Sequence, residues 1–369
     1  MDKYRILKEY FGHDSFREGQ EALIDSVLSG RDVLGIMPTG AGKSMCYQIP
    51  GLMMEGVTVV ISPLISLMKD QVNSLIQSGV KAAYLNSSLT SAQYETALRN
   101  AVKGMYKIIY VAPERLCTQG FLYFAQRVKI AVLAVDEAPC VSQWGQDFRP
   151  SYIKIPEFIS QLSYRPVIAA FTATATQDVK EDIEKLLTLK EPYTLTTGFD
   201  RENLYFEVRR PQDKFAEVLE ILRRNKDKSG IIYCSTRKNV EEVCRRLNDE
   251  GFPCTRYHAG LSDEERRTNQ DDFTCDRVQL ITATNAFGMG IDKSNVSFVI
   301  HYNMPKNIES YYQEAGRAGR DGEPAECILL YNGQDVRTNR FLIENSDDNP
   351  ELDEETAADI RSRDLERLK

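Results

Sequence analysis

The chain has 369 residues, more than one average domain needs and about right for two. Its 42% hydrophobic content is ample for buried cores, and no run of about 18 apolar residues occurs, which excludes a membrane span. The N-terminus lacks the apolar stretch of a signal peptide, so the expected compartment is the cytosol or nucleoid of a bacterial-type cell. The net charge of −8 argues against general polyanion binding, so any contact with nucleic acid must come from a localised surface.

Short apolar runs alternate with helical patterns along the chain. They are rich in β-branched residues and occupy residues 32–36, 57–61, 107–111, 130–135, 166–171, 230–234, 278–282 and 296–300. Continuous apolar strands separated by helices are typical of a parallel sheet that helices cover on both faces. The predicted fold class is therefore α/β, with doubly wound parallel sheets.

The strand–helix pattern breaks once and then restarts. Proline, glycine and charged residues interrupt it near residues 190–215, and a second series begins at about Phe215. We expect four segments along the chain: a first domain (1–198), a linker (199–212), a second domain (213–337) and a C-terminal connection (338–369). The last of these starts with an acidic, solvated stretch and continues into a helix-favouring sequence, 354–369, that has no stop signal.

A glycine-rich segment, Met37–Ser44, lies between an apolar run and a helical pattern. Glycines such as Gly40 and Gly42 let the backbone wrap closely around phosphates, and the helix N-terminus offers unpaired N–H groups. Lys43 is suited to reach the β- and γ-phosphates, Thr39 to line the loop, and Ser44 to hold Mg²⁺. The segment therefore predicts a nucleotide-phosphate site.

Two carboxylates follow the apolar run 130–135. The carboxyl end of a strand in an open α/β sheet is where ligands bind. We assign Asp136 to the metal and Glu137 to the attacking water. By itself an acidic pair after a strand is more often part of a solvated loop, and only its combination with a phosphate loop favours the catalytic interpretation.

The next segment carries aromatic, polar and cationic side chains near the predicted nucleotide site. Trp144, Phe148 and Arg149 suit base stacking and phosphate contact, so we expect contacts to nucleic acid here. The alternative for Trp144, the only tryptophan, is that it fills a core.

In the second half, Arg317 and Arg320 are three residues apart, so on a helical turn they share a face. From a facing domain they could stabilise a phosphoryl transition state as arginine fingers. A solvated basic turn is the usual fate of such a pair. The glycine-spaced segment 283–292 follows a strand and is by itself a generic loop.

Taken together, these segments resemble the RecQ family of DNA helicases, within helicase superfamily 2, over residues 5–335. The segments Phe11–His13, Phe16–Arg17 and Gly19–Gln20 look like the family's adenine-recognition motif, in which a ring stacks on the base and a glutamine reads its edge. That resemblance gives His13, Arg17 and Gln20 nucleotide roles. It also implies that both domains are RecA-like.

Other segments are similar to the family's strand-binding and coupling motifs. In the first half these are 63–71, 112–116, 171–176 and the aromatic-rich loop 142–150, and in the second half 234–237, 257–261, 283–292 and 311–322. The resemblance implies nucleotide contacts for Asp292 and Gln313. It implies contacts to DNA, or coupling to them, for Ser142, Gln143, Ser235, Arg237, His258 and Thr284.

The activity implied by the resemblance is that of an ATP-dependent DNA helicase in DNA repair and recombination, moving 3′→5′. The implied cofactors are ATP and Mg²⁺, and the implied partners are single-stranded and partly duplex DNA. We expect the chain to act as a monomer and to have no membrane partner. The other interpretations are an RNA helicase, or a nucleotide-gated DNA-binding protein with weak hydrolysis.

The sequence departs from the family pattern in three places. Pro139 stands where the family usually has histidine in Asp-Glu-Ala-His, and Gln146 where it often has histidine in Trp-Gly-His. The family's zinc-binding module needs four cysteines after the second domain, and no cysteine follows Cys327. We therefore expect no zinc within this chain. We also expect proline in the first turn after Glu137 to be tolerated and to bias Ala138 toward extended backbone.

Overall fold

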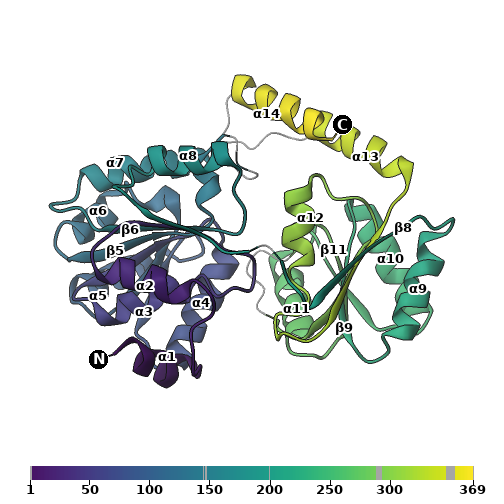
Figure 1. Cartoon of the computed structure of the whole chain (residues 1–369), viewed down its shortest axis with the longest axis horizontal. Coiled ribbons are helices and arrows are strands. Elements are labelled where there is room, and N and C mark those ends of the chain that lie inside the picture. Colours follow the sequence, from purple (N-terminus) through teal and green to yellow (C-terminus); the bar gives the residue numbers. More distant parts are fainter. Residues whose placement is uncertain are drawn as a thin grey trace. The chain divides into compact units, whose positions relative to one another are not determined.

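The apolar runs form two parallel sheets, one in each half of the chain (Figure 1). The structure, a computed structural model, describes residues 2–143, 145, 148–198, 200–287, 293–345 and 354–368. It divides into two units, Met1–Phe199 and Asp200–Lys369. Each unit has its own sheet and its own hydrophobic core.

The sheet of the first unit has the strand order β3-β4-β2-β5-β6-β1-β7, and all its recorded pairings are parallel. The strands are β1 (Val33–Ile36), β2 (Val57–Ile61), β3 (Ala82–Leu85), β4 (Ile108–Val111), β5 (Ile130–Val135), β6 (Val167–Thr172) and β7 (Tyr193–Thr196). The helices are α1 (Lys3–Phe11), α2 (Gln20–Leu28), α3 (Met45–Met53), α4 (Ile65–Gln77), α5 (Ser91–Val102), α6 (Gln119–Ala125), α7 (Lys154–Ser160) and α8 (Gln177–Leu186), with short 3₁₀ turns η1 (Pro113–Arg115), η2 (Ala138–Val141) and η3 (Pro150–Ile153).

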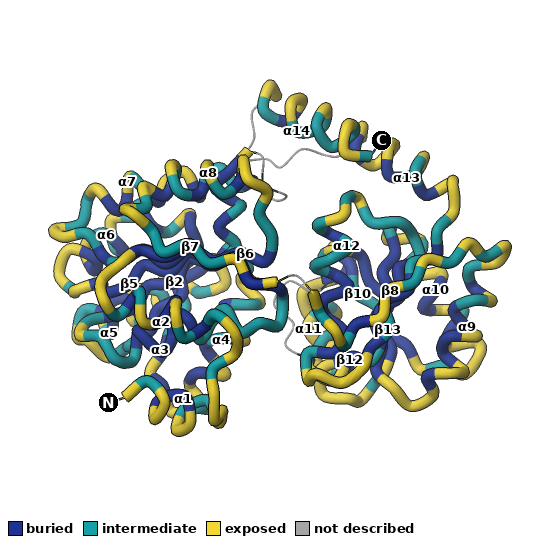
Figure 2. Tube along the Cα trace, in the orientation of Figure 1, coloured by how far each residue is buried: buried dark blue, intermediate teal, exposed yellow. Residues whose placement is uncertain are grey.

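Helices cover both faces of this sheet because its central strands carry apolar side chains on both sides. One core cluster joins the strands to α7 and α8, and another joins them to α2 and α3 (Figure 1). The strands β1, β2, β4 and β5 are buried along their whole length, and Figure 2 shows the sheet around β2 and β5 in dark blue. The doubly wound α/β class predicted from the sequence is confirmed.

The sheet of the second unit has the order β10-β11-β9-β12-β13-β8, again parallel throughout its recorded pairings. Its strands are β8 (Leu204–Arg209), β9 (Ser229–Tyr233), β10 (Cys254–Tyr257), β11 (Leu280–Ala283), β12 (Val296–His301) and β13 (Ala325–Leu330). Its helices are α9 (Lys214–Arg224), α10 (Arg237–Asp249), α11 (Asp263–Thr274), α12 (Ile308–Ala315), α13 (Gly333–Glu344) and α14 (Glu354–Arg367). Helices α9 and α10 pack on one face, and α11 and α12 on the other (Figure 1).

The segments expected as connections contain regular structure. Residues 199–212 include β8, which pairs with β13 at the edge of the second sheet, so part of the expected linker belongs to the second unit's sheet. Helix α13 crosses the boundary expected at residue 337. Helix α14 confirms the helix-favouring character of residues 354–369, while the acidic stretch 346–353 lies outside the described residues.

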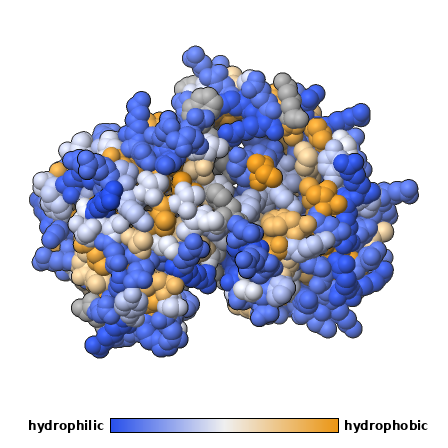
Figure 3. All heavy atoms as spheres, viewed as in Figure 1, coloured by the Kyte–Doolittle hydropathy of each residue, from blue (hydrophilic) through white to orange (hydrophobic). Residues whose placement is uncertain are grey.

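Hydrophilic residues cover most of the visible face of each unit (Figure 3). Among the described residues, no helix is long and apolar enough to cross a membrane.

Candidate functional site

The predicted phosphate loop connects β1 to α3. The Met37 N–H donates to the Thr172 carbonyl oxygen at 2.9 Å, so sheet bonding continues past the end of β1. Gly40 and Gly42 have φ of 86° and 78°, a left-handed backbone that glycine adopts without a β-carbon clash. Lys43 Nζ donates back to the Met37 carbonyl oxygen at 3.1 Å. The turn therefore presents backbone N–H groups at the start of α3, where an anion is stabilised.

Gln20 braces this loop from α2. Its side-chain nitrogen donates to the carbonyl oxygens of Ala41 and Gly42, both at 3.0 Å, and its side-chain oxygen accepts from the Arg17 N–H at 2.8 Å. Arg17 also donates to the Gly40 carbonyl oxygen. The structure thus brings Arg17 and Gln20 to the phosphate loop, whereas His13 is exposed just after α1.

Asp136 and Glu137 follow β5 directly. The Asp136 N–H donates to the Ile61 carbonyl oxygen at 2.9 Å, which continues the sheet by one residue. Glu137 has φ 48° and ψ 50°, a left-handed conformation that side-chain sterics disfavour for residues with a β-carbon. Since β5 and β1 flank β6 and run parallel, the carboxylates and the phosphate loop share one edge of the sheet.

The Asp136 carboxyl group binds its proton more tightly in the folded protein than a carboxyl group does in water. Burial raises the pKa of its carboxyl to about 7; the neighbouring Glu137 charge adds to the rise, and Lys43 opposes it. The Glu137 N–H donates to Asp136 Oδ1 at 3.1 Å, and the Tyr152 hydroxyl donates to the Asp136 carbonyl oxygen at 3.0 Å. A cation bound here would relieve the repulsion between the two carboxylates.

Pro139 lies in the first turn of η2, as expected from its missing donor. The expectation of extended backbone at Ala138 is wrong, because that residue begins the 3₁₀ turn; the left-handed Glu137 makes the change of direction instead. A β-carbon at Gly145 would lie 2.1 Å from the Pro139 carbonyl oxygen. Only glycine permits this close approach of the following loop.

The loop after η2 is partly buried. Ser142 is buried and its hydroxyl donates to Asp182 Oδ2 at 2.5 Å, Phe148 is also buried, and Gln143 is exposed. Arg149 Nη1 donates to the Pro63 carbonyl oxygen at 3.0 Å, which ties the loop to the start of the segment 63–71. Trp144 and Gln146 lie outside the described residues.

A buried polar cluster beneath the phosphate loop did not emerge from the sequence. Gln48 Nε2 donates to Gln71 Oε1 and to the Tyr110 hydroxyl, both at 3.1 Å, and the hydroxyls of Tyr47 and Tyr110 are 3.3 Å apart. These side chains join α3, α4 and β4. Tyr47 and Gln48 stand in an otherwise apolar helix, and the two polar groups within it were the only available signal.

In the second unit, the predicted DNA-contacting residues follow three adjacent parallel strands. Ser235 and Arg237 come after β9, His258 after β10 and Thr284 after β11, so all four lie at one edge of the sheet. Arg237 is exposed. His258 is held in place: its Nδ1 accepts from the Gly260 N–H at 3.1 Å, and its Nε2 lies 2.8 Å from Glu241 Oε1.

The predicted arginine fingers lie after α12, in residues 316–322, which we call the arginine turn. Arg317 is buried and Arg320 half-buried. Burial raises the pKa of Tyr233 to about 12, and the charge of Arg317, within hydrogen-bonding reach, opposes that rise. Gln313 is half-buried on α12, and Asp292 lies outside the described residues.

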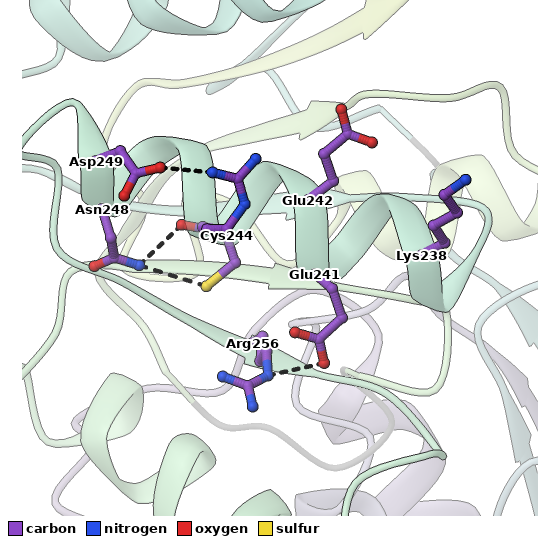
Figure 4. A pocket seen from close by; sticks show the side chains of 8 residues that line it. Lys238, Glu241, Glu242, Cys244, Asn248, Asp249 and Arg256 are labelled. Carbon is purple, nitrogen blue, oxygen red and sulfur yellow. Dashed lines mark hydrogen bonds and ion pairs between the residues drawn. The ribbon is translucent and has the colours of Figure 1, made fainter.

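A surface hollow in the second unit involves none of the predicted site residues. It is lined by Lys238, Glu241, Glu242, Cys244, Arg245, Asn248, Asp249 and Arg256 (Figure 4). Many of these groups pair with one another: Arg245 with Asp249 at 2.8 Å, and Arg256 with Glu241 at 2.9 Å. Because these charges are already neutralised by neighbours, the hollow offers little to a charged ligand.

Comparisons with known proteins agree with this arrangement. The DEAD/DEAH box helicase family model matches residues 17–182, and the helicase conserved C-terminal domain model matches residues 213–322. The structure is similar to Saccharomyces cerevisiae Dbp5 bound to RNA and ADP BeF3 (TM-score 0.71, 18% identity, 99% of this chain and 97% of that one). It is also similar to the DUF1998 helicase MrfA bound to DNA (TM-score 0.74, 18% identity, 99% and 54%). At that identity the likeness shows the fold alone.

Sequence relatives are closer. The ATP-dependent DNA helicase RecQ of Bacillus subtilis is 48% identical over 343 residues, 93% of this chain and 58% of that protein. That of Pasteurella multocida is 45% identical, over 92% of this chain and 54% of that protein. The probable ATP-dependent DNA helicase RecS of Bacillus subtilis is 38% identical, over 92% and 69%. The chain spans somewhat more than half the length of the two RecQ relatives. The chain belongs to the RecQ family of DNA helicases.

Proposed function

We propose that this chain is the motor of an ATP-dependent DNA helicase that moves 3′→5′ along single-stranded DNA and separates duplex DNA during repair and recombination. The observation that carries the proposal is the shared sheet edge of the first unit, where the phosphate loop, its Gln20 brace and the Asp136–Glu137 pair meet. The proposed compartment is the one that holds the DNA, the cytosol or nucleoid of a bacterial-type cell, and the proposed active species is a monomer.

In the proposed chemistry, backbone N–H groups of the phosphate loop and Lys43 bind the ATP phosphates. The Ser44 hydroxyl and the Asp136 carboxylate are oxygen donors of the kind Mg²⁺ prefers, and a bound cation would offset the charge of Glu137 beside Asp136. When bound, Mg²⁺ supplies charge neutralisation to the phosphates. Glu137 orients the water and accepts its proton as the water oxygen bonds to the γ-phosphorus and the bridging P–O bond to ADP breaks.

The other predicted residues have proposed roles in binding and coupling. Positive charge from Arg317 and Arg320 offsets the charge that develops on the transferred phosphoryl group. Nucleotide contacts are proposed for His13, Arg17, Gln20, Thr39, Gln313 and Asp292. For DNA, we propose contacts through the sheet edge that carries Ser235, Arg237, His258 and Thr284, and through the loop that carries Gln143, Trp144 and Arg149, with Ser142 and Phe148 packing that loop in place.

The test is ATP turnover measured without nucleic acid, with single-stranded DNA and with single-stranded RNA, together with unwinding of duplexes that carry a 3′ or a 5′ tail. The proposal expects stimulation by DNA and separation of the 3′-tailed duplex. Equal or stronger stimulation by RNA would make the chain an RNA helicase. ATP-dependent DNA binding without turnover would make it a nucleotide-gated binding protein.

A further inference from the structure

The first residues of the second unit hold the arginine turn. Arg201 Nη2 donates to the carbonyl oxygens of Ala318 at 3.1 Å and Gly319 at 2.7 Å. Asn203 Nδ2 donates to the carbonyl oxygens of Gly319 at 2.8 Å and Glu323 at 2.9 Å. The two side chains also support each other, since Arg201 Nε donates to Asn203 Oδ1 at 3.2 Å.

These bonds fall on the peptide groups between the two predicted arginine fingers. Ala318 and Gly319 separate Arg317 from Arg320, and Gly319 has a left-handed φ of 57°. The Gly319 N–H donates to the Val296 carbonyl oxygen at 2.8 Å. Gly319 is therefore fixed on both sides of its α-carbon, by β12 through its N–H and by Arg201 and Asn203 through its carbonyl oxygen.

The fit around Gly319 is tight. A β-carbon there would lie 2.4 Å from Asn203 Nδ2 and 2.9 Å from the Glu323 carbonyl oxygen. The backbone of the segment is bound as well, because the Ala325 N–H donates to the Asn203 carbonyl oxygen at 2.8 Å. The side chains at 201 and 203 therefore meet the turn at a defined distance, with little room for it to shift.

The helix before the turn is anchored from another direction. His301 Nε2, at the end of β12, lies 2.9 Å from Glu314 Oε2 on α12, and both side chains are buried. This pair fixes α12, but it does not touch the peptide groups at Ala318 and Gly319. The carbonyl oxygens between the arginines accept from the side chains of Arg201 and Asn203, and that of Gly319 also accepts from the Gly322 N–H at 3.1 Å.

We propose that Arg201 and Asn203 are positioning residues for ATP hydrolysis: they hold the arginine turn so that Arg317 and Arg320 keep the orientation in which they act on the phosphoryl group. The inference rests on the function proposed above for those two arginines. Catalytic groups lose about 10²-fold in rate when displaced by roughly 1 Å. Arg201 is the second residue of the second unit, which begins at Asp200, so the brace of the arginine turn lies at the start of that unit.

The experiment compares Arg201→Ala, Arg201→Lys and Asn203→Asp in the full chain, with ATP turnover measured at saturating single-stranded DNA. We expect kcat to fall about 10- to 100-fold in Arg201→Ala, with KM for ATP within about threefold of the parent, because the binding groups of the first unit are untouched. Lysine can still donate to one carbonyl oxygen and should restore part of kcat. Asn203→Asp places a carboxylate against the carbonyl oxygens that Asn203 Nδ2 contacts. A carboxylate cannot donate to them, so kcat should fall.

The matched control is Arg224→Ala, which removes an exposed arginine paired with Glu326 at 3.0 Å on the same unit. It should keep the parent kcat. Thermal unfolding of every variant separates loss of fold from loss of positioning. If Arg201→Ala does not fold, Arg201→Lys takes its place in the comparison with the parent. A parent-like kcat in the folded Arg201 variant and in Asn203→Asp overturns the proposal.

A mutant cycle separates this inference from the function on which it rests. If Arg201 acts through the turn, Arg201→Ala should lower kcat less than about threefold when Arg317 and Arg320 are both already alanine. Effects that multiply overturn the positioning role while leaving the arginine fingers intact. A parent-like kcat when Arg317 and Arg320 are both alanine overturns the function proposed for these two arginines and the positioning role with it.

Discussion

The side-chain nitrogen of Gln20 lies 3.0 Å from the carbonyl oxygen of Gly42 and donates a hydrogen bond to it. A β-carbon at Gly42 would lie 2.4 Å from the same nitrogen, so helix α2 and the phosphate loop are in close contact. The side chain for which the family motif implies a contact to the adenine edge thus fixes the loop that is proposed to bind the phosphates.

We expect Gln20→Ala to weaken ATP binding about tenfold, which is roughly 1.4 kcal/mol, because two loop carbonyl groups lose their donor. The measurement is the Kd for ATP and for inorganic triphosphate. A brace for the loop weakens both, whereas a residue that only reads adenine weakens ATP alone. Gln177→Ala, which removes an exposed glutamine on α8 paired with Glu181, is the control and should change neither value.

Glu137→Gln keeps the shape of the side chain but removes the charge that polarises water. Turnover should fall by about 10²-fold or more while the Kd for ATP stays near that of the parent. Lys43→Ala, in contrast, should lose nucleotide affinity as well. Single-turnover hydrolysis and equilibrium binding of ATP measure the two effects separately. Near-normal turnover in Glu137→Gln would contradict the assignment of the water to this carboxylate.

The raised pKa of Asp136 makes the stability of the metal-free protein depend on pH. The folded chain binds this proton more tightly than the unfolded chain, so the resulting stabilisation is complete below about pH 4 and is lost as the pH rises through about 7. Asp136→Asn cannot lose a proton. It should therefore unfold less readily than the parent at pH 8 in EDTA, by up to about 4 kcal/mol, and the difference should shrink toward pH 5.

Denaturant unfolding at pH 5, 6, 7 and 8 checks this expectation. Asp271→Asn, at an exposed position on α11, is the control and should follow the parent at every pH. Mg²⁺ with ATP should narrow the gap at pH 8, since a cation favours the ionised carboxylate that only the parent has. A gap that does not change with pH would mean that Asp136 does not titrate in this range.

Trp144→Ala should retain basal ATP turnover but respond poorly to single-stranded DNA. Loss of one stacked base is worth about 1–3 kcal/mol, so the DNA concentration for half-maximal stimulation should rise at least about fivefold. The control for loss of a surface aromatic is Tyr123→Ala, which removes an exposed ring on α6 with the Arg127 guanidinium over it. Stimulation of Trp144→Ala equal to that of the parent would show that this side chain serves packing instead.

Most internal strands of both sheets were predictable from the sequence, whereas the internal strand β13 and all four edge strands were not. The runs at 57–61 and 130–135 became β2 and β5 with the same bounds, because a strand buried on both faces must be continuously apolar. Solvent reaches part of each of the edge strands β3, β7, β8 and β10. The sequences of β7, β8 and β10 mix polar with apolar residues, and β3 has only four residues, two of them alanine. Their strand conformation depends on pairing with a neighbour that is distant in sequence.

The same division holds for the site. The sequence by itself determined the phosphate loop and the Asp136–Glu137 pair, because a loop that wraps phosphates needs glycines and a lysine in a fixed local order. Only the tertiary structure decided that Gln20 braces the loop, that Gln48 joins Gln71 and Tyr110, and that Arg201 and Asn203 hold Gly319. A hydrogen bond from Asn203 to Gly319 spans 116 residues of sequence. Such contacts arise from the packing of whole elements, which leaves no period or spacing in the sequence to detect.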